Sequence, residues 1–386
     1  MTREPSSRAR AARTSPIRSM TSECARVGGI NLAQGVCDTP VPEAVRRAAQ
    51  AAIEAGANTY TRSDGVPELR AALAAKMQRD DGLDYAADGE IVVTSGATGA
   101  FYVAAQALLE PGDEVVLFEP YYGYHRNTLE ALGVRPAYVA LAAPDFSLDP
   151  ADLEAALGPR TRALVVNTPG NPSGKVWTPA ELQAVGEIAR ARDLWIFTDE
   201  VYEHFVFDGR SHTSPAALPG LRERTITMNA LSKTFAITGW RIGWIAAPRP
   251  LAEAFAHLHD LVYVCAPAPL QLACARGLEK LDPEYYAAIA VEYQRKRDQL
   301  CAALAEAGLA PSVPAGSYFA LADLSRLPGE SGDERALELL ARAGVACVPG
   351  TAFWRGSEGD RLGRFCFGKT DADLDEACRR LRNMQV

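Results

Sequence analysis

The stretch Arg224–Pro248 places a potentially reactive side chain in an apolar setting. It reads RTITMNALSKTFAITGWRIGWIAAP, with Ser232 and Lys233 between two apolar runs and Arg241 eight residues after the lysine. Burying an ammonium group is costly unless it is paired or loses its proton. Desolvation lowers the pKa of a lysine, and the neutral amine is a nucleophile toward carbonyl groups. Because a single lysine is more often a solvated surface charge, this interpretation depends on what accompanies Lys233.

Two further groups follow predicted strands and suit a phosphate and a flat ring. After the strand at residues 90–94, the turn SGATGA opens a helix, and its N–H groups and helix dipole favour a phosphate near Ala97 and Thr98. After the strand at residues 114–118, Tyr122 offers an aromatic face. The alternatives are an ordinary strand-to-helix turn and aromatic packing in the core or at an interface.

Polar side chains also follow the next two predicted strands. Asn171 lies in the rigid loop NTPGNPSG after the strand at residues 163–167, and Asp199 follows the apolar run LWIFT, with Tyr202 one helical turn later. A buried carboxylate is costly unless a cation meets it. Ligands of parallel α/β sheets bind at the carboxyl ends of strands, so we expect these side chains to share a site. A tight turn at Asn171 and a helix cap at Asp199 are the alternatives.

One cofactor accounts for Lys233 and all of these groups. Pyridoxal phosphate needs a lysine that binds its aldehyde and an acid that keeps its pyridine nitrogen protonated. It also needs hydrogen bonds to its phenolic oxygen, and cations or helix N-termini around its phosphate. Each signal is weak alone, but their order and spacing together favour a pyridoxal-phosphate site.

The elements around these residues indicate an α/β protein. Up to about residue 282, short apolar runs alternate with helical patterns, which predicts a three-layer large domain with a mainly parallel sheet. From residue 283, a long charged helix and short strand-like runs predict a smaller α+β domain. The predicted organisation is a disordered tail (1–14), a segment that packs with the small domain (15–44), the large domain (45–282) and the small domain (283–386).

Charge and composition argue against several classes of protein. The chain has 386 residues and a formal net charge of −8, which argues against a general nucleic-acid binder. It has no apolar run long enough to span a membrane, and its Arg- and Ser-rich start lacks the apolar core of a secretory signal. Eight cysteines without CxxC spacing fit buried thiols in a reducing compartment. We therefore expect a cytoplasmic protein with no metal site and no membrane or nucleic-acid partner.

The chain resembles the fold-type I pyridoxal-phosphate-dependent aminotransferases of class I/II over about residues 30–381. The motifs SKTFAITGWR, DEVY and NPSG carry the resemblance. It implies pyridoxal 5′-phosphate as cofactor, Lys233 as the catalytic lysine that binds it covalently, and Asp199 as the partner of its pyridinium nitrogen. It implies further cofactor contacts by Ala97, Thr98, Tyr122, Asn171, Tyr202, Ser232 and Arg241.

The same resemblance implies a substrate site and a homodimer. Arg364 in GRFCFGK would clamp the substrate α-carboxylate, where a bidentate guanidinium outperforms a lysine. Gly35 in NLAQG and Asn171 would also contact the substrate. Tyr60 in TYTR is similar to the tyrosine that this family lends across the dimer interface to the phosphate of the neighbouring subunit.

Several stretches resemble the kynurenine, glutamine and methionine aminotransferase branch, among them INLAQG, YTRSDGVPELR and PAGSYFALADLS. The expected activity is a ping-pong transfer of the α-amino group of a neutral, aromatic or sulfur-containing L-amino acid to a 2-oxo acid. The sequence departs from the branch at Val36 and Cys37, where an aromatic residue and a proline are usual. No arginine can be assigned to a substrate side-chain carboxylate, so the sequence gives no support for a dicarboxylic substrate.

Three other functions are compatible with parts of the pattern. A cysteine-conjugate β-lyase, or another reaction of the same cofactor, would use the same residues. A non-catalytic regulatory protein on this fold usually adds a DNA-binding domain, for which the tail of about fourteen residues leaves no room. A Rossmann oxidoreductase would need a G-x-G-x-x-G motif after its first strand, and SGATGA lacks that spacing.

Overall fold

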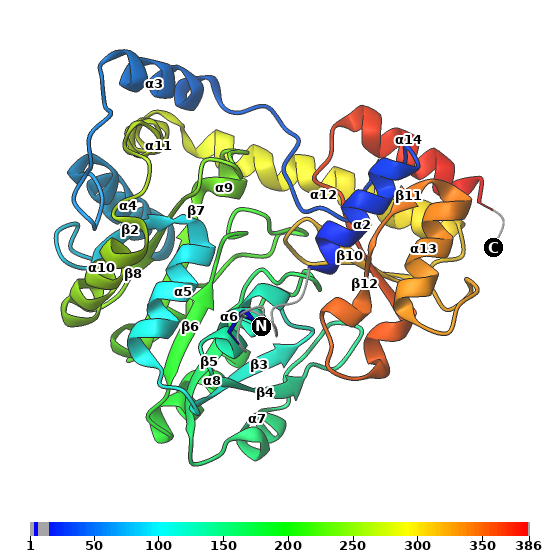
Figure 1. Ribbon diagram of the computed structural model, residues 1–386, viewed down its shortest axis with the longest axis horizontal. Helices are drawn as coiled ribbons and strands as arrows, with labels where there is room; N and C mark the ends of the chain where they lie inside the picture. The colour runs from blue at the N-terminus through cyan, green and yellow to red at the C-terminus, as the bar shows by residue number, and fades with distance from the viewer. Residues whose placement is uncertain (1–3, 7–14, 385–386) are drawn as a thin grey trace.

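The computed structural model describes residues 4–6 and 15–384 (Figure 1). Its largest sheet, among the described residues, has seven strands in the order β2-β8-β7-β6-β5-β3-β4. All neighbouring strands pair in parallel except β8, which runs antiparallel to β2 and β7. The strands are β2 (Ile91–Ser95), β3 (Glu114–Glu119), β4 (Arg135–Ala140), β5 (Thr161–Asn167), β6 (Trp195–Asp199), β7 (Thr225–Ala230) and β8 (Ile242–Ala246).

Strands of this sheet are apolar on both faces because helices cover both. In β3, Val115 and Leu117 face a core shared with α5 and α10, whereas Val116 and Phe118 face a core shared with α7 and α8. This period of two with both faces buried is typical of a parallel sheet between helix layers. The helices of this part are α3 (Glu43–Glu54), α4 (Pro67–Asp81), α5 (Gly96–Leu108), α6 (Gly123–Ala131), α7 (Pro150–Ala156), α8 (Pro179–Ala191), α9 (Leu231–Thr234), α10 (Arg249–Tyr263) and α11 (Ala268–Lys280).

The register of the parallel strands brings their carboxyl ends to one edge. Asn167 at the end of β5 lies opposite Asp199 at the end of β6, and Asp199 lies opposite Met228 of β7. The chain leaves β7 directly into the short helix α9, which carries Lys233. The edge of the sheet therefore holds an amide, a carboxylate and an amine close together.

A second group of elements lies on the right of Figure 1 around a small antiparallel sheet of order β12-β13-β10-β9. Helix α2 also belongs to this group: it contacts β11 and β12, and β1 pairs with β11. These elements are α2 (Pro16–Arg26), β1 (Ile30–Asn31), α12 (Pro283–Glu306), β9 (Pro311–Ser312), β10 (Phe319–Asp323), α13 (Gly332–Ala343), β11 (Val345–Ala346), β12 (Val348–Pro349), β13 (Leu362–Cys366) and α14 (Asp371–Arg382).

The predicted fold class is confirmed: the protein is α/β, with a large, mainly parallel sheet and a smaller α+β part. Helix α12 begins at Pro283, and the side chain of Asp282 caps it by accepting from the Tyr285 N–H. The predicted tail, residues 1–14, lies outside the described residues except for residues 4–6. Within the described part of the chain, no helix is long and apolar enough to cross a bilayer.

Candidate active site

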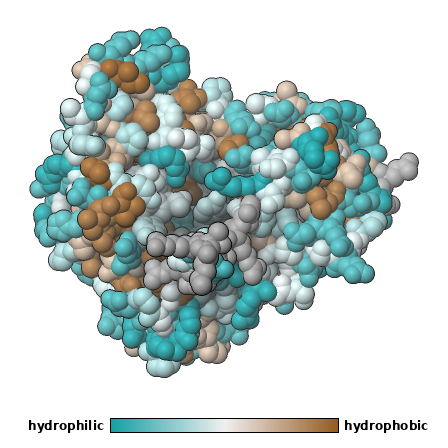
Figure 2. Space-filling model, in the orientation of Figure 1, coloured by the Kyte–Doolittle hydropathy of each residue, from teal (hydrophilic) through white to brown (hydrophobic). Residues whose placement is uncertain are grey.

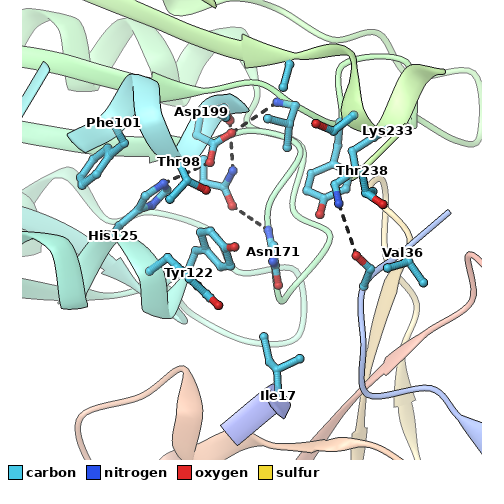
Figure 3. A pocket seen from close by; sticks show the side chains of 18 of the residues that line it. Ile17, Val36, Thr98, Phe101, Tyr122, His125, Asn171, Asp199, Lys233 and Thr238 are labelled. Atoms are coloured by element: carbon cyan, nitrogen blue, oxygen red, sulfur yellow. Dashed lines mark hydrogen bonds and ion pairs between the residues drawn. The ribbon is translucent and has the colours of Figure 1, made fainter. Parts of the chain in front are cut away.

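A cavity of about 600 Å³ opens at the carboxyl edge of the large sheet. Figure 2 shows the surface hollowed between the two groups of elements, and Figure 3 shows the side chains around the cavity. Its lining includes all but one of the residues predicted to bind cofactor or substrate: Gly35, Ala97, Thr98, Tyr122, Asn171, Asp199, Tyr202, Ser232, Lys233, Arg241 and Arg364. The exception is Tyr60, which is 82% exposed on the surface of this chain.

Lys233 reaches into the cavity from α9 and carries a partly desolvated amine. Its Nζ donates to the backbone oxygen of Gly35 at 3.3 Å and lies 5.5 Å from the centre of the Tyr318 ring. Burial lowers the pKa of Lys233 from its ordinary value, and the charge of Arg241 adds to the effect. A lysine with a lowered pKa is more often neutral, and the neutral amine is the nucleophilic and basic form.

Asp199 is buried and held in a fixed orientation. Its Oδ2 lies 3.1 Å from Nε2 of His125, which comes from the first turn of α6. The backbone oxygen of Asp199 accepts from the Asn167 side chain at 3.0 Å. The His125 ring in turn packs against Phe101, with ring centres 4.5 Å apart. Such support fixes the carboxylate so that it can meet one cationic N–H in the cavity.

Asn171 connects the loop after β5 with the small sheet. Its backbone N–H donates to Oδ1 of Asn167 at 2.7 Å, which fixes the loop. Its own Oδ1 accepts from Nη1 of Arg364 at 2.8 Å. The side-chain oxygen is therefore occupied, and the remaining amide hydrogens of Asn171 are available as donors to a ligand.

Arg364 is a buried cation for which no carboxylate partner exists among the described residues. It lies on β13, is 1% exposed, and stacks on Phe319 with Cζ 4.1 Å from the ring centre. Its Nη2 donates to the backbone oxygen of Ala33 at 2.7 Å, and its Nε has no partner in the described structure. Burial lowers the pKa of this guanidinium from its ordinary value, although an arginine remains charged. A buried charge left in this state is expected to receive an anionic ligand.

Gly35 makes this arrangement of Arg364 and Phe319 feasible. A Cβ at position 35 would lie 2.5 Å from Cζ of the Phe319 ring, which is closer than real contacts allow. Glycine therefore lets the backbone approach the ring on which Arg364 stacks. The same close approach leaves the Gly35 carbonyl within reach of Lys233.

The start of α5 forms a cradle for an anion together with Arg241 and Ser232. The N-cap Ser95 makes no side-chain capping hydrogen bond, so the first N–H groups of α5 are not satisfied from that residue. A Cβ at Gly96 would lie 2.4 Å from Nη2 of Arg241, so glycine lets the guanidinium approach the helix start. Uncapped N–H groups beside an arginine match the requirements of a phosphate.

Tyr122 and Tyr202 provide an aromatic face and a hydroxyl donor. Tyr122 packs edge-on against His125, with ring centres 5.1 Å apart. Burial raises the pKa of both phenols, which keeps each of them protonated and able to donate a hydrogen bond. Figure 3 shows Tyr122 on the same side of the cavity as Asn171 and His125.

These groups fit pyridoxal 5′-phosphate. The cradle at α5 suits its phosphate, the fixed Asp199 suits a protonated ring nitrogen, and Lys233 suits its aldehyde. The unpartnered Nε of Arg364 leaves a cation for a carboxylate of the substrate. The residues of the cavity therefore offer partners for both the cofactor and an amino acid or 2-oxo acid substrate.

His125 is the main residue of the site that was not predicted from the sequence. It lies three residues after Tyr122 on the first turn of α6, so the two side chains share one helix face. That spacing could have indicated that a second side chain, beside that of Tyr122, faces the site at the end of β3. Its pairing with Asp199 could not have been found from spacing, because 74 residues separate them.

Comparison with known proteins identifies the family. Residues 27–381 match the family described as "Aminotransferase class I and II". The chain belongs to this family. It is a pyridoxal-phosphate-dependent aminotransferase, whose substrates are an amino acid and a 2-oxo acid, and the predicted family and cofactor are confirmed.

Relatives of this aminotransferase act on different amino acids, according to their names. It is 39% identical to the probable N-succinyldiaminopimelate aminotransferase DapC of Mycobacterium tuberculosis over 97% of both chains, and the structure of the enzyme of that name from this species superimposes with a TM-score of 0.94. It is 36% identical to the methionine aminotransferase of Escherichia coli over 92% of both chains. It is 33% identical to human kynurenine–oxoglutarate transaminase 1, again over 92% of both.

Proposed function

We propose that this aminotransferase moves the α-amino group of a neutral, aromatic or sulfur-containing L-amino acid to a 2-oxo acid by a ping-pong mechanism. The observation that carries the proposal is the placement of Lys233, with its lowered pKa, in one cavity with the buried cation Arg364. The amine of Lys233 suits removal of a proton, and the guanidinium of Arg364 suits the α-carboxylate that every such substrate carries.

Bound pyridoxal phosphate supplies an aldehyde that combines with amines and a ring that withdraws electrons from the α-carbon. Lys233 would bind the cofactor covalently, and Asp199, whose carboxylate is held by His125, would keep the ring nitrogen protonated. The phosphate would be held by Ser232, Thr98 and Arg241, which line the cavity, and by the first N–H groups of α5, including that of Ala97. Asn171 and Tyr202, which line the cavity, would donate to the phenolic oxygen, and Tyr122 would stack on the ring.

Lys233 also moves the proton on which the reaction depends. When its Nζ is not bound to the cofactor, the neutral amine would take the proton from the substrate α-carbon. Arg364 orients the substrate through its α-carboxylate so that this proton faces the amine. Reverse proton transfer with a second substrate completes the cycle at the same atoms.

The expected donor class follows from the apolar groups around the cavity and from the relatives. Ile17, Val36 and Phe319 line the space into which a side chain would extend. Methionine and kynurenine occur in the names of two relatives, and both are donors with sulfur-containing or aromatic side chains.

A donor screen tests the proposal and separates transamination from β-elimination. We expect methionine, phenylalanine or kynurenine to give more than one equivalent of 2-oxo acid per active site only when a 2-oxo acid acceptor is present, with one acceptor consumed for each further product. Chromatographic quantification of both acids measures this ratio. Release of pyruvate from a cysteine conjugate without any acceptor would instead identify a β-lyase.

We also propose a homodimer in which Tyr60 of each subunit reaches the cofactor phosphate of the other. Tyr60 is 82% exposed and lies outside the cavity of its own chain. Near the end of α10, Leu261 and Val262 are also exposed, at 80% and 45%, and Tyr263 lines the cavity. Figure 2 shows apolar side chains (brown) gathered on the left of the view, where Figure 1 places α10. A clustered apolar surface beside a site favours an interface there.

Hybrid dimers test the shared tyrosine. We expect Tyr60→Ala to weaken cofactor affinity by about tenfold, because a hydrogen bond to a charged phosphate is lost. In a hybrid of one Tyr60→Ala subunit and one Lys233→Ala subunit, the site with an intact Lys233 receives the intact Tyr60. Fluorescence titration should then find one site per dimer with wild-type affinity and about half of the wild-type activity. A hybrid that remains as weak as the Tyr60→Ala homodimer would contradict the exchange.

A further inference from the structure

The turn that follows β6 presents different residues to its two sides. Asp199 and Tyr202 line the active-site cavity, whereas Glu200 and Glu203 are not among its lining residues in the described part of the chain. Both glutamates are nevertheless buried, at 1% and 8% exposure. Because successive side chains along a strand point to opposite faces, Glu200 points away from Asp199. The proposed function gives the two buried glutamates no role.

Glu200 is a buried carboxylate whose two oxygens both have partners. Its Oε1 accepts hydrogen bonds from Oγ1 of Thr198 at 3.0 Å and from Oγ of Ser214 at 2.8 Å. Its Oε2 lies 3.0 Å from Nε2 of His212. A carboxylate can be buried when such partners replace water, and the loss of one partner is costly. The side chain of Glu200 is therefore held in one orientation.

His212 supplies positive charge that balances Glu200. Burial opposes protonation of the His212 ring, but the hydrogen bond to Glu200 and the negative charge of Glu200 outweigh burial, so the pKa of His212 is raised. The negative charges of Glu203 and Asp81 act in the same direction. A protonated ring donates to the carboxylate as a charged partner. The ion pair therefore ties the turn after β6 to residues 212–214.

The hydrogen bond between Thr198 and Glu200 restrains Asp199, which lies between them in sequence. Linking the two flanking side chains restricts the backbone on both sides of Asp199. The backbone oxygen of Asp199 is held as well, because it accepts from the Thr168 N–H at 3.0 Å. With its backbone fixed in this way, Asp199 directs its carboxylate toward the cavity and His125 (Figure 3).

We propose that Glu200 is a positioning residue for Asp199: it links Thr198 to residues 212–214 and so fixes the direction in which the Asp199 carboxylate meets the ring nitrogen of the cofactor. This inference rests on the role of Asp199 in the proposed function. Glu200 lies outside the cavity and acts only through Asp199. The direction matters because a hydrogen bond weakens steeply when donor and acceptor are misaligned.

Two isosteric substitutions on neighbouring strands test this role. Thr198→Val removes only the hydrogen bond that restrains Asp199. Thr225→Val on β7 is the matched control, because it removes the buried hydrogen bond from Oγ1 of Thr225 to the Leu221 oxygen at 2.8 Å. We expect both variants to lower the Tm. Only Thr198→Val should lower kcat about tenfold, with the KM for the amino acid changed less than about threefold because Arg364 is untouched.

The absorbance of the bound cofactor gives a readout that does not need turnover. Its change with pH depends on the charge of the ring, which Asp199 is proposed to set. In Thr198→Val and Glu200→Leu holoenzymes, we expect the pH of this change to shift in the same direction as in Asp199→Asn, by a smaller amount. Glu200→Gln should stay close to the wild-type enzyme, because its amide oxygen still accepts from Thr198 and Ser214.

Two outcomes would overturn the inference, and they are distinguishable. Equal effects of Thr198→Val and Thr225→Val on kcat and on the absorbance would show that Glu200 only stabilises the fold. Wild-type absorbance and kcat in Asp199→Asn would refute the role of Asp199 in the proposed function, without any change at Thr198 or Glu200.

Discussion

Replacing Lys233 with alanine should lower the transamination rate about 10⁴-fold, because it removes both the amine that binds the cofactor and the base that takes the α-proton. Burial of Lys233 within this chain lowers the pKa of its amine. The rate of 2-oxo acid formation measures the loss. The exposed Lys280 at the end of α11 is the matched control, and its alanine variant should keep wild-type activity.

A chemical readout separates this role from general damage to the fold. Borohydride reduction of the wild-type enzyme should attach the cofactor to the peptide that contains Lys233, as detected by mass spectrometry. The Lys233→Ala variant should bind the cofactor without such attachment. A variant that keeps near-normal activity, or a label found on another lysine of the wild-type enzyme, would refute the assignment.

Replacing Arg364 with lysine should reduce kcat/KM for amino acids about 100-fold, mainly through KM, and change cofactor affinity less than about threefold. The guanidinium is held by Asn171, by the Ala33 carbonyl and by stacking on Phe319, and a lysine cannot reproduce that geometry. Steady-state kinetics and a cofactor titration measure the two effects.

Ligand-induced stabilisation offers a second measurement on Arg364. A simple carboxylate such as propanoate should raise the Tm of the wild-type enzyme, because it binds the folded state. The rise should be much smaller in Arg364→Lys. Equal loss of substrate and cofactor affinity would show that Arg364 supports the whole cavity and does not act as a carboxylate clamp.

Much of the fold could be predicted because the apolar pattern of most segments matches the helix or strand that each segment forms in the structure. The last residues of β5 and β6, Asn167 and Asp199, are polar residues that directly follow buried apolar runs, and this change of character marked the ends of those strands. Strand β4 and the antiparallel direction of β8 were not predicted. Strand β4 (RPAYVA) is only partly buried at the edge of the sheet, and strand direction leaves no trace in local periodicity.

The site was predictable where a motif surrounds the residue, and not where only tertiary structure creates the contact. Lys233 and Asn171 could be placed from their neighbours in sequence. His125 could not be paired with Asp199 in this way, and Arg18 could not be placed at the cavity at all. Arg18 lies in the segment predicted to pack with the small domain, and only the packing of α2 places its side chain at the cavity.

The most direct test of the central claim is a single half-reaction without any acceptor. Purified holoenzyme is mixed with individual L-amino acids while the yellow absorbance of the bound cofactor is followed. The proposed function predicts loss of this absorbance with at least one neutral, aromatic or sulfur-containing amino acid, and its recovery when a 2-oxo acid is added. Unchanged absorbance with every amino acid would contradict the assignment of this chain as a working aminotransferase.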